Sequence, residues 1–353
     1  MLSFQVERFG EPLVEVRREL PEPQGAQVVL EIAACGVCHS DVHLWEGFFD
    51  LGDGQKLDAT RIVSPPRTLG HEIVGTVTAV GPDVHGVKAG ARRVIYPWTG
   101  CGQCELCQAG KEHLCNRPTA LGIQRDGGFA QSVLVPDEKY LLAYDPLPEA
   151  QACTYACAGL TAFGALKKAL PLAGGEQLLI VGAGGVGLSA IRLAKALYGV
   201  APVVAEVDRE KWDVARSAGA GDVIDPGEPD ALRTLIRGSG GGVAAAVDFV
   251  GAGSSFEFAL GALRKAGRLI SVGLFGGSAR VAPALVAMRA LSIIGSYVGS
   301  LDEMRELMQI ARSEALPELP VTERPLHDVS ATLVDLKHGR VRGRVVVRPN
   351  GKA

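Results

Sequence analysis

The sequence lacks an excess of basic residues, a long apolar run and an internal repeat. Its 353 residues carry a formal net charge of -3, with Lys and Arg spread along the chain, so nothing favours binding to nucleic acid or an anionic membrane. The most apolar stretch, 178–191, is interrupted by glycines and is shorter than the ~20 residues of a membrane-spanning helix. The start, MLSFQVERFG, has neither a basic n-region nor an apolar h-region. We therefore expect a cytoplasmic protein whose partner is a small molecule.

The pattern of expected strands and helices changes near residue 159, and the length of the chain allows two domains. The earlier part holds short strand-like runs separated by Gly and Pro, with little helical periodicity. The later part alternates strand-like and helix-like segments, which is typical of βαβ units and a doubly wound parallel sheet. A helix over 254–267, strands over 268–275 and 291–297, a helix over 301–313 and a final strand over 344–349 are expected. The predicted fold class is α/β, with a mostly β part before it.

A glycine-rich turn follows the apolar strand at 178–181. Gly182, Gly184 and Gly187 have G-x-G-x-x-G spacing, which permits a tight turn, close approach of a pyrophosphate and close packing of helix on strand. Glu206 follows about 20 residues later, at the end of a second strand, where a carboxylate binds ribose hydroxyls and repels a 2'-phosphate. The pattern predicts dinucleotide binding and favours NAD, with Arg209 leaving NADP as an alternative and simple packing of the turn as another.

Four of the eight cysteines crowd into one loop as C-x2-C-x2-C-x7-C. Four thiolates at such spacing favour a closed, tetrahedral structural zinc site. An iron–sulfur cluster is the first alternative, although the expected x3-C-P continuation is missing, and free or redox-active thiols are the second. The ligands would be Cys101, Cys104, Cys107 and Cys115.

Three further residues are candidates for a catalytic zinc site, which keeps three protein ligands and one open position. They are Cys38, His71 and Cys157, each beside small residues at the edge of an expected element. Taken singly, a buried cysteine is often only a small apolar residue, and a lone histidine is often structural. Spacing alone does not show that the three converge.

Five motifs follow one another along the chain: GVCHSDVH (36–43), GHE (70–72), the four-cysteine loop, CAGLT (157–161) and GAGGVG (182–187). In this order and at these separations they make the chain resemble the zinc-dependent medium-chain alcohol dehydrogenases, particularly the yeast and bacterial type. The resemblance covers essentially the whole chain and implies a GroES-like catalytic domain joined to a Rossmann domain, with Cys38, His71 and Cys157 holding the catalytic zinc and two Zn²⁺ per chain. It places the domains at 1–155 (GroES-like), 156–295 (Rossmann, NAD-binding) and 296–353 (return to the catalytic domain).

The resemblance also implies roles at the reacting centre. Ser40 is expected to receive the alcohol proton and His43 to pass it to solvent. Asp41 is expected to orient His71, which fixes the tautomer of a metal-ligating imidazole. Glu72 matches a carboxylate that approaches the metal when its ligands rearrange.

Cofactor contacts are expected from several segments. Thr161 would lie against the nicotinamide, Arg344 would bind the pyrophosphate, and His39 would reach the cofactor phosphates. The remaining residues expected at the cofactor are Gly185, Val186, Lys211, Val250 and Val272.

The function that follows is reversible hydride transfer between a primary or secondary alcohol and NAD+, because zinc as a Lewis acid lowers the pKa of a bound hydroxyl. Alternatives on the same zinc site are an ω-hydroxy acid such as 6-hydroxyhexanoate, a polyol or a formaldehyde adduct. A non-enzymatic zinc-bearing binding protein is a further alternative, disfavoured by the presence of Cys38, Ser40 and His71.

An extended segment at 46–70 and nearby aromatic residues give a hypothesis about substrate. Aromatic side chains would form an apolar pocket, with simple packing as the alternative. Arg61 or Arg67 would meet the carboxylate of an ω-hydroxy acid. The aromatic candidates are Trp45, Phe48, Phe49 and Trp98.

Two features remain outside this site. The apolar segment 291–299 resembles an edge strand that pairs across a two-fold axis, so we expect a dimer or a homotetramer. Cys35 and Cys153 have no partner set and are expected to be neither redox-active nor ligands.

Overall fold

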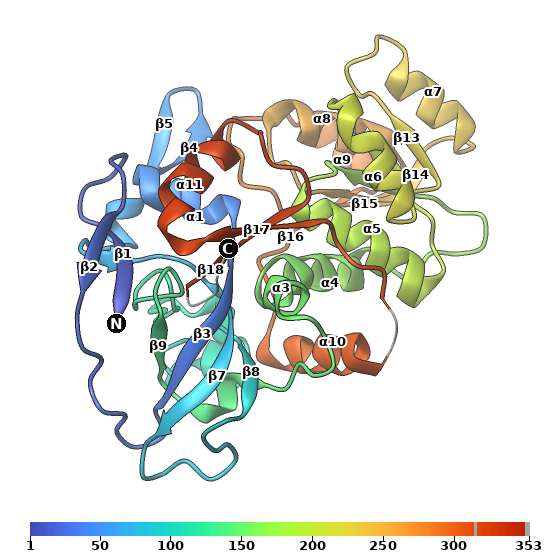
Figure 1. The fold of residues 1–353 in the computed structure, drawn as a ribbon. Helices are drawn as coiled ribbons and strands as arrows, with labels where there is room; N and C mark the ends of the chain where they lie inside the picture. Colours follow the sequence, from blue (N-terminus) through green and yellow to red (C-terminus); the bar gives the residue numbers. More distant parts are fainter. Residues whose placement is uncertain (314–315, 350–353) are drawn as a thin grey trace. The chain divides into compact units, whose positions relative to one another are not determined.

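The computed structural model describes residues 1–313 and 316–349, which divide into two compact units (Figure 1). Unit 1 comprises Met1–Phe48, Asp58–Leu160 and the described residues from Gly299 onward. Unit 2 comprises Phe49–Leu57 and Thr161–Val298. The short segment Phe49–Leu57 therefore belongs to unit 2, although its neighbours in the sequence on both sides belong to unit 1.

Unit 1 is mainly β. Its strands are β1 (Leu2–Val6), β2 (Val14–Arg17), β3 (Val28–Val37), β6 (Arg67–Thr68), β7 (Glu72–Val80), β8 (Arg92–Ile95), β9 (Ser132–Val135), β10 (Leu141–Leu142), β17 (Val321–Pro325) and β18 (Arg344–Arg348). The larger sheet has the order β10-β8-β7-β3-β18-β17, with β9 also paired to β3, and the smaller has the order β2-β1-β6. Only β17 and β18 are parallel among the paired strands described in this unit.

Short helices connect or follow these strands. They are α1 (His39–Glu46), α2 (Glu105–Gln108), α3 (Glu149–Ala152), α10 (Leu301–Ser313) and α11 (Val329–Lys337), with 3-10 turns η1 (Ala59–Arg61), η2 (Glu112–Leu114), η3 (Glu138–Tyr140), η4 (Cys153–Ala156) and η6 (Leu326–Asp328). The predicted helix over 301–313 is confirmed as α10, whose buried Leu301, Met304, Leu307 and Met308 recur at helical spacing.

Unit 2 contains the parallel sheet that the alternating pattern predicts, which confirms the α/β class. Its strands are β11 (Leu178–Val181), β12 (Val203–Ala205), β13 (Asp222–Ile224), β14 (Val243–Asp248), β15 (Leu263–Ser271) and β16 (Ser292–Gly295), with the separate hairpin β4 (Phe48–Gly52) and β5 (Gln55–Asp58). The order β13-β12-β11-β14-β15-β16 is parallel at every pairing. All four residues of the central β11 are buried, as expected for a strand with both faces covered.

Helices accompany the parallel sheet in chain order (Figure 1). They are α4 (Ala158–Ala169), α5 (Gly185–Tyr198), η5 (Arg209–Lys211), α6 (Trp212–Ser217), α7 (Ala231–Gly238), α8 (Gly253–Ala262) and α9 (Pro283–Met288). Helix α5 ends where Gly199 adopts a left-handed conformation (φ 65°) and its N–H bonds back to the carbonyls of Ala194 and Lys195. No helix within the described ranges is both long and apolar enough to cross a membrane.

Two expected elements have wrong boundaries, and one helix was not expected. The helix expected over 254–267 ends at Ala262, because Leu263 is fully buried and pairs with Val243, so tertiary pairing overrides the helix propensity of the segment that follows. The strand expected over 268–275 ends at Ser271. The first part of the chain also contains α1, which the strand-like pattern did not predict.

Candidate functional site

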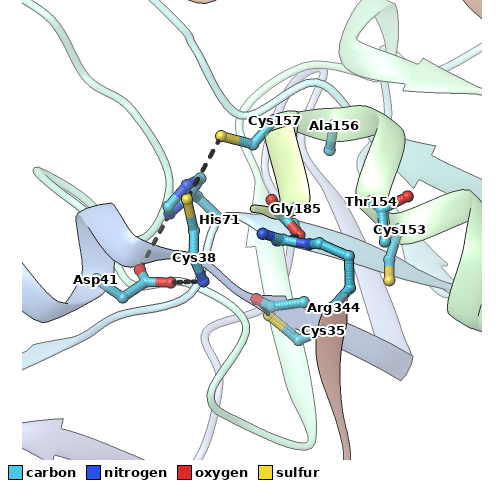
Figure 2. A network of polar contacts seen from close by, with 12 residues as sticks. Cys35, Cys38, Asp41, His71, Cys153, Thr154, Ala156, Cys157, Gly185 and Arg344 are labelled. Carbon is cyan, nitrogen blue, oxygen red and sulfur yellow. Dashed lines mark hydrogen bonds and ion pairs between the residues drawn. The ribbon is translucent and has the colours of Figure 1, made fainter. Parts of the chain in front are cut away.

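A buried cluster in unit 1 brings together residues from distant parts of the chain (Figure 2). One ligand atom from each of four side chains lies within 4.8 Å of the others, and the sulfurs of Cys38 and Cys157 are 3.9 Å apart. All four residues are buried. The members are Cys38, His71, Glu72 and Cys157.

The ends of regular elements hold these side chains in place. Cys38 follows β3 and is the N-cap of α1, with an extended backbone (φ -102°, ψ 156°) that turns the chain into the helix. His71 directly precedes β7, and Cys157 follows η4 and precedes α4. The three candidate ligands therefore sit where strands or turns end, rather than within a strand or helix.

Asp41, fully buried in α1, ties two of these positions together. One carboxylate oxygen accepts the backbone N–H of Cys38 at 2.9 Å, and the other lies 3.0 Å from His71 Nδ1. A carboxylate acceptor places the proton on Nδ1 and leaves the lone pair on Nε2. His71 Nε2 is buried and has no hydrogen-bond partner, so the imidazole presents an unused lone pair, suited to a metal ion, beside two thiols. This donor set fits a zinc ion.

Charge is shared within the cluster. The hydrogen bond from Cys157 lowers the pKa of the Cys38 thiol well below its usual value despite burial, and His71 adds to the effect. The same hydrogen bond, together with burial, raises the pKa of Cys157. Burial opposes protonation of His71, but Asp41 and Cys38 raise its pKa well above the usual value. A cation bound here would stabilise the thiolate forms of Cys38 and Cys157 and would take the place of a proton on His71 Nε2.

Glu72 and Arg344 form a buried ion pair beside the cluster. Burial raises the pKa of Glu72 to about 7, against the lowering effect of Arg344. The Glu72 Oε1 atom is buried without a partner, while Oε2 accepts from the Arg344 guanidinium. Arg344 is thus engaged within unit 1, and its expected contact with the pyrophosphate remains a prediction.

The residues expected to carry the proton lie on the first turns of α1. Ser40 Oγ is 3.4 Å from Cys38 Sγ, which places a hydroxyl directly beside the cluster. His43 is buried, and its ring makes an edge contact with His39, with centroids 5.2 Å apart. Thr161 is buried in α4, four residues after Cys157 in the chain.

The second cluster is the four-cysteine loop around α2 and η2. Its sulfur–sulfur distances include 3.5 Å for Cys104–Cys107, 3.7 Å for Cys104–Cys115 and 4.0 Å for Cys101–Cys107. A zinc ion with Zn–S bonds of about 2.3 Å needs tetrahedral edges of about 3.8 Å. The thiols therefore fit a closed four-sulfur site. Gly100 is required for this closeness, because a Cβ there would lie 2.5 Å from the sulfur of Cys107.

The glycine-rich turn in unit 2 has the geometry that its spacing predicts. Gly182 has φ 92°, and a Cβ on Gly187 would lie 1.9 Å from the carbonyl oxygen of Gly182, so both positions need glycine. A Cβ on Gly184 would meet nothing within 4 Å, which leaves space for a ligand in front of the N-terminus of α5. The carboxylate of Glu206 accepts the N–H of Ala183 at 2.7 Å and that of Asp208 at 2.9 Å.

Positive side chains near Glu206 are engaged elsewhere. Arg209 pairs with Glu228 at 2.9 Å, and Lys211 pairs with Asp208 at 3.3 Å. These pairs weaken the case for a 2'-phosphate partner, the NADP alternative that Arg209 had left open.

The aromatic residues predicted to line a substrate pocket have different surroundings in the structure. Trp98 donates its indole N–H to the carbonyl of Ala156 and makes an edge contact with His71, with centroids 5.2 Å apart. Trp45 instead donates to the carbonyl of Glu11. Phe48 and Phe49 are half-buried.

The arginine candidates and the leftover cysteines also have definite surroundings. Arg67 pairs with Asp126 at 3.4 Å, a carboxylate that Arg18 contacts at 2.7 Å, and Arg61 is exposed on η1. Cys35 fills packed space, since a Cβ on Gly128 would lie 2.5 Å from its sulfur, and burial raises the pKa of both Cys35 and Cys153. High pKa values make these thiols unreactive.

Two candidate functional residues, Glu112 and Asp248, were not predicted from the sequence. Glu112 anchors the four-cysteine loop by accepting from Tyr140 at 2.5 Å and from Lys139 at 3.0 Å. Asp248 is a fully buried acid at the end of β14. Its signal in the sequence is an acidic residue at the end of an apolar parallel strand, where side chains reach the ligand edge of the sheet.

Comparison with known proteins accounts for the whole chain. The alcohol dehydrogenase GroES-like domain matches residues 24–146, and the zinc-binding dehydrogenase domain matches residues 185–313. An NAD-dependent alcohol dehydrogenase of Sulfurisphaera tokodaii is 34% identical over 358 aligned residues, covering 99% of this chain and 100% of the relative. An alcohol dehydrogenase of Geobacillus stearothermophilus is 34% identical, with 99% of both chains covered.

A solved structure gives the same result. The alcohol dehydrogenase from the archaeon Aeropyrum pernix superposes with a TM-score of 0.87 at 30% identity, covering 99% of this chain and 100% of that one. The predicted GroES-like and Rossmann architecture and the predicted NAD and zinc dependence are thereby confirmed. The chain belongs to the zinc-dependent medium-chain alcohol dehydrogenases and is an enzyme that transfers hydride between an alcohol and NAD+.

Proposed function

We propose that Cys38, His71 and Cys157 hold the catalytic zinc and that the four-cysteine loop holds a second, structural zinc, giving two ions per chain. The observation that carries the first assignment is the buried, unpartnered Nε2 of His71 beside two thiols whose sulfurs are 3.9 Å apart. The near-tetrahedral spacing of the loop sulfurs supports the second.

The protein's own residues prepare this site. Asp41 keeps the His71 proton on Nδ1, so that Nε2 remains a donor atom, and the same carboxylate holds the backbone of Cys38. Glu72 and Arg344 compensate each other's charge inside the unit. Zinc bound here supplies a Lewis acid that increases the acidity of an alcohol hydroxyl.

Ser40 and His43 take the roles of a proton route. Ser40 Oγ lies beside the cluster at 3.4 Å from Cys38 Sγ, where it would accept the proton of the substrate hydroxyl. His43 follows on the same helix, and histidine is the side chain best suited to exchange protons near neutral pH. Removal of the substrate's hydroxyl proton leaves the carbon that bears the oxygen able to transfer hydride to the nicotinamide.

The cofactor path follows the edge of the parallel sheet. The amides at the start of α5, from Gly184 to Val186, would bind the pyrophosphate, and Glu206 would accept the adenosine ribose hydroxyls. The other residues that we assign to the cofactor are His39, Thr161, Lys211, Val250, Val272 and Arg344. In this arrangement unit 1 is the catalytic domain and unit 2 the nucleotide-binding domain, and the boundaries follow the two units.

We propose an uncharged alcohol with an apolar body as the substrate class. Trp98, in edge contact with His71, supports an apolar wall. Arg67 already has a carboxylate partner in Asp126, which weakens the argument for a contact with the carboxylate of an ω-hydroxy acid.

The quaternary structure that we propose is a dimer, or a homotetramer of such dimers. Strand β16 lies at the end of its sheet, and Ile293, Leu285 and Met288 are 42, 52 and 70% exposed. An exposed apolar edge is a liability that pairing with a second copy removes. Multi-angle light scattering tests the assembly, with I293K expected to shift it toward monomer.

We place the enzyme in the cytoplasm, where the free thiols of both clusters stay reduced.

The test of the main proposal combines turnover with metal content. NADH absorbance over a panel of primary, secondary, aromatic and ω-carboxylated alcohols is expected to show activity that is greatest with uncharged substrates. Metal analysis of the same sample is expected to give about two zinc per chain. A metal content near one, or a preference for carboxylated alcohols, would overturn the corresponding assignment.

A further inference from the structure

Asp248 in unit 2 is a buried acid with no role in the assignments above. It is the last residue of β14, the strand adjacent to the central β11, and its side chain is fully buried. In a doubly wound sheet the carboxyl ends of the strands next to the topological switch point face the ligand. A buried carboxylate costs free energy unless hydrogen bonds compensate it, so its partners indicate what it holds.

The side chain of Asp248 organises the loop after β14. Its Oδ1 accepts the backbone N–H groups of Val250 at 2.9 Å and Gly251 at 3.1 Å. Its Oδ2 accepts the hydroxyl of Ser255, at 2.9 Å, in the first turn of α8. The carboxylate therefore bends the chain sharply between the strand and the helix.

The backbone of Asp248 holds a second loop. Its carbonyl oxygen accepts the N–H groups of Val272 and Gly273, both at 3.0 Å, directly after β15. The two loops then touch, since a Cβ on Gly251 would lie 2.0 Å from the carbonyl oxygen of Gly273. One residue thus sets the relative position of two adjacent loops at the ligand edge of the sheet.

The first of these loops also reaches the glycine-rich turn. A Cβ on Gly182 would lie 2.7 Å from a methyl group of Val250. The turn after β11 and the loops after β14 and β15 consequently form one packed layer, in which a shift at Asp248 moves Val250 against the turn.

Strand order shows which half of the cofactor this layer faces. Glu206 follows β12, on one side of β11, whereas Asp248 follows β14, on the other side. A dinucleotide binds across the switch point with its pyrophosphate at the central turn. With the adenosine ribose at Glu206, the nicotinamide half lies along the loops that Asp248 holds.

We infer that Asp248 is a positioning residue for the nicotinamide half of NAD(H), acting through Val250 and Val272. The inference rests on the cofactor path proposed above. It requires that loss of Asp248 weakens binding of the whole dinucleotide while binding of its adenosine half is spared.

The experiment compares NADH and AMP binding to the full-length protein, by nicotinamide fluorescence and by calorimetry. D248A removes the side-chain acceptors and is expected to weaken NADH binding about tenfold, the scale of one or two lost hydrogen bonds to a charged group, with AMP changed less than about twofold. D248N keeps an acceptor for Val250 and Gly251 and can donate to Ser255, so it is expected to restore most of the NADH affinity.

A second variant keeps the test valid if D248A does not fold. G251A drives the two loops apart through the contact with Gly273 and is expected to reproduce the selective loss of NADH binding. Its matched control is G240A, at a glycine with φ +70°, close to the +73° of Gly251, but with nothing within 4 Å of the added Cβ.

The outcomes separate this inference from the function on which it rests. A wild-type protein that binds AMP but not NADH would overturn the cofactor path itself. If the wild type binds both, equal weakening of NADH and AMP in D248A and G251A assigns Asp248 to the scaffold alone and overturns the inference. Unchanged NADH binding in both variants overturns it as well.

Discussion

Unit 1 contains two cysteine-rich clusters that the chain builds in opposite ways. The cluster of Cys38, His71 and Cys157 draws on distant segments, is buried and has the ionisable side chains Asp41 and Glu72 around it. The four-cysteine loop, by contrast, comes from residues 101–115, and Cys101 and Cys104 are partly exposed.

The two clusters also stabilise thiolates differently. In the loop, backbone N–H groups of Gln103 and Cys104 lower the pKa of Cys101 to about 6, whereas burial raises that of Cys107 to about 12. In the buried cluster, side chains from other segments have the larger part. One loop thus brings four thiols together through local contacts, whereas the site that we propose as catalytic contains buried charges that the surrounding fold has to compensate.

The largest effect is expected at Cys38. C38A removes one of the three zinc ligands that we propose for the buried cluster, so activity is expected to fall by about 10³-fold, which corresponds to about 4 kcal/mol in the barrier. Steady-state NADH formation measures the activity, and metal analysis should show the loss of about one zinc per chain. C153A, at a buried cysteine outside both clusters, is the control. Equal activity of C38A and C153A would mean that the buried cluster is not the reacting centre.

A substitution of Asp41 tests whether the buried cluster, unlike the four-cysteine loop, depends on a buried carboxylate. D41N leaves either His71 or the backbone of Cys38 without its acceptor, and a loss of about 10- to 100-fold in activity or zinc affinity is expected. The measurement is kcat/KM together with a chelator titration. D126N, at a half-buried aspartate paired with Arg18 and Arg67, should change neither. A D41N enzyme with normal zinc affinity and normal turnover would contradict this role.

A substitution of Cys104 tests whether the four-cysteine loop contributes to stability rather than to turnover. C104S is expected to lower the free energy of unfolding by about 2–4 kcal/mol, as for loss of a structural crosslink, while kcat at low temperature stays within about twofold. Urea denaturation and metal analysis give the two readouts. Should kcat fall as steeply as in C38A, the four-cysteine loop would have to be coupled to the reaction.

Glu112 gives the smallest effect and a pH signature. Burial opposes its ionisation, but hydrogen bonds from Tyr140 and Lys139 lower the pKa of Glu112 below the ordinary value. Its stabilisation is therefore complete above the unfolded pKa of about 4.3 and is lost as the pH falls through the folded value. E112Q is expected to cost about 1 kcal/mol at neutral pH.

The pH dependence is read as a difference between two proteins. Urea midpoints of wild type and E112Q are compared at pH 7 and at about pH 3.5, and the gap is expected to shrink at the lower pH. A gap that stays constant with pH would show that Glu112 contributes by packing alone.

Local patterns were the predictable part of this molecule. The four-cysteine loop and the glycine-rich turn are short, and their geometry depends on neighbours in the chain, such as Gly100 beside Cys107 or Gly182 beside Gly187. The helix over 254–267 was predicted too long because the pairing of Leu263 with Val243, a contact between distant residues, decides where it ends.

Side-chain partners at long range were not predictable. Trp45 and Trp98 were equal candidates for the pocket, and only the structure directs Trp98 toward His71 and Trp45 toward Glu11. Arg67 was a candidate for binding a carboxylate, and the structure gives it Asp126. Such choices depend on which surfaces the folded sheets bring together.

The sequence by itself determined the order of the motifs, the α/β alternation and the two ligand inventories, because these depend on residue type and spacing. Only the tertiary structure decided that Cys38, His71 and Cys157 meet, that Asp41 joins two of them and that Asp248 holds two loops. The reason is physical, since hydrogen bonds and sulfur contacts act over a few ångströms, and only folding brings residues 38, 71 and 157 within that range.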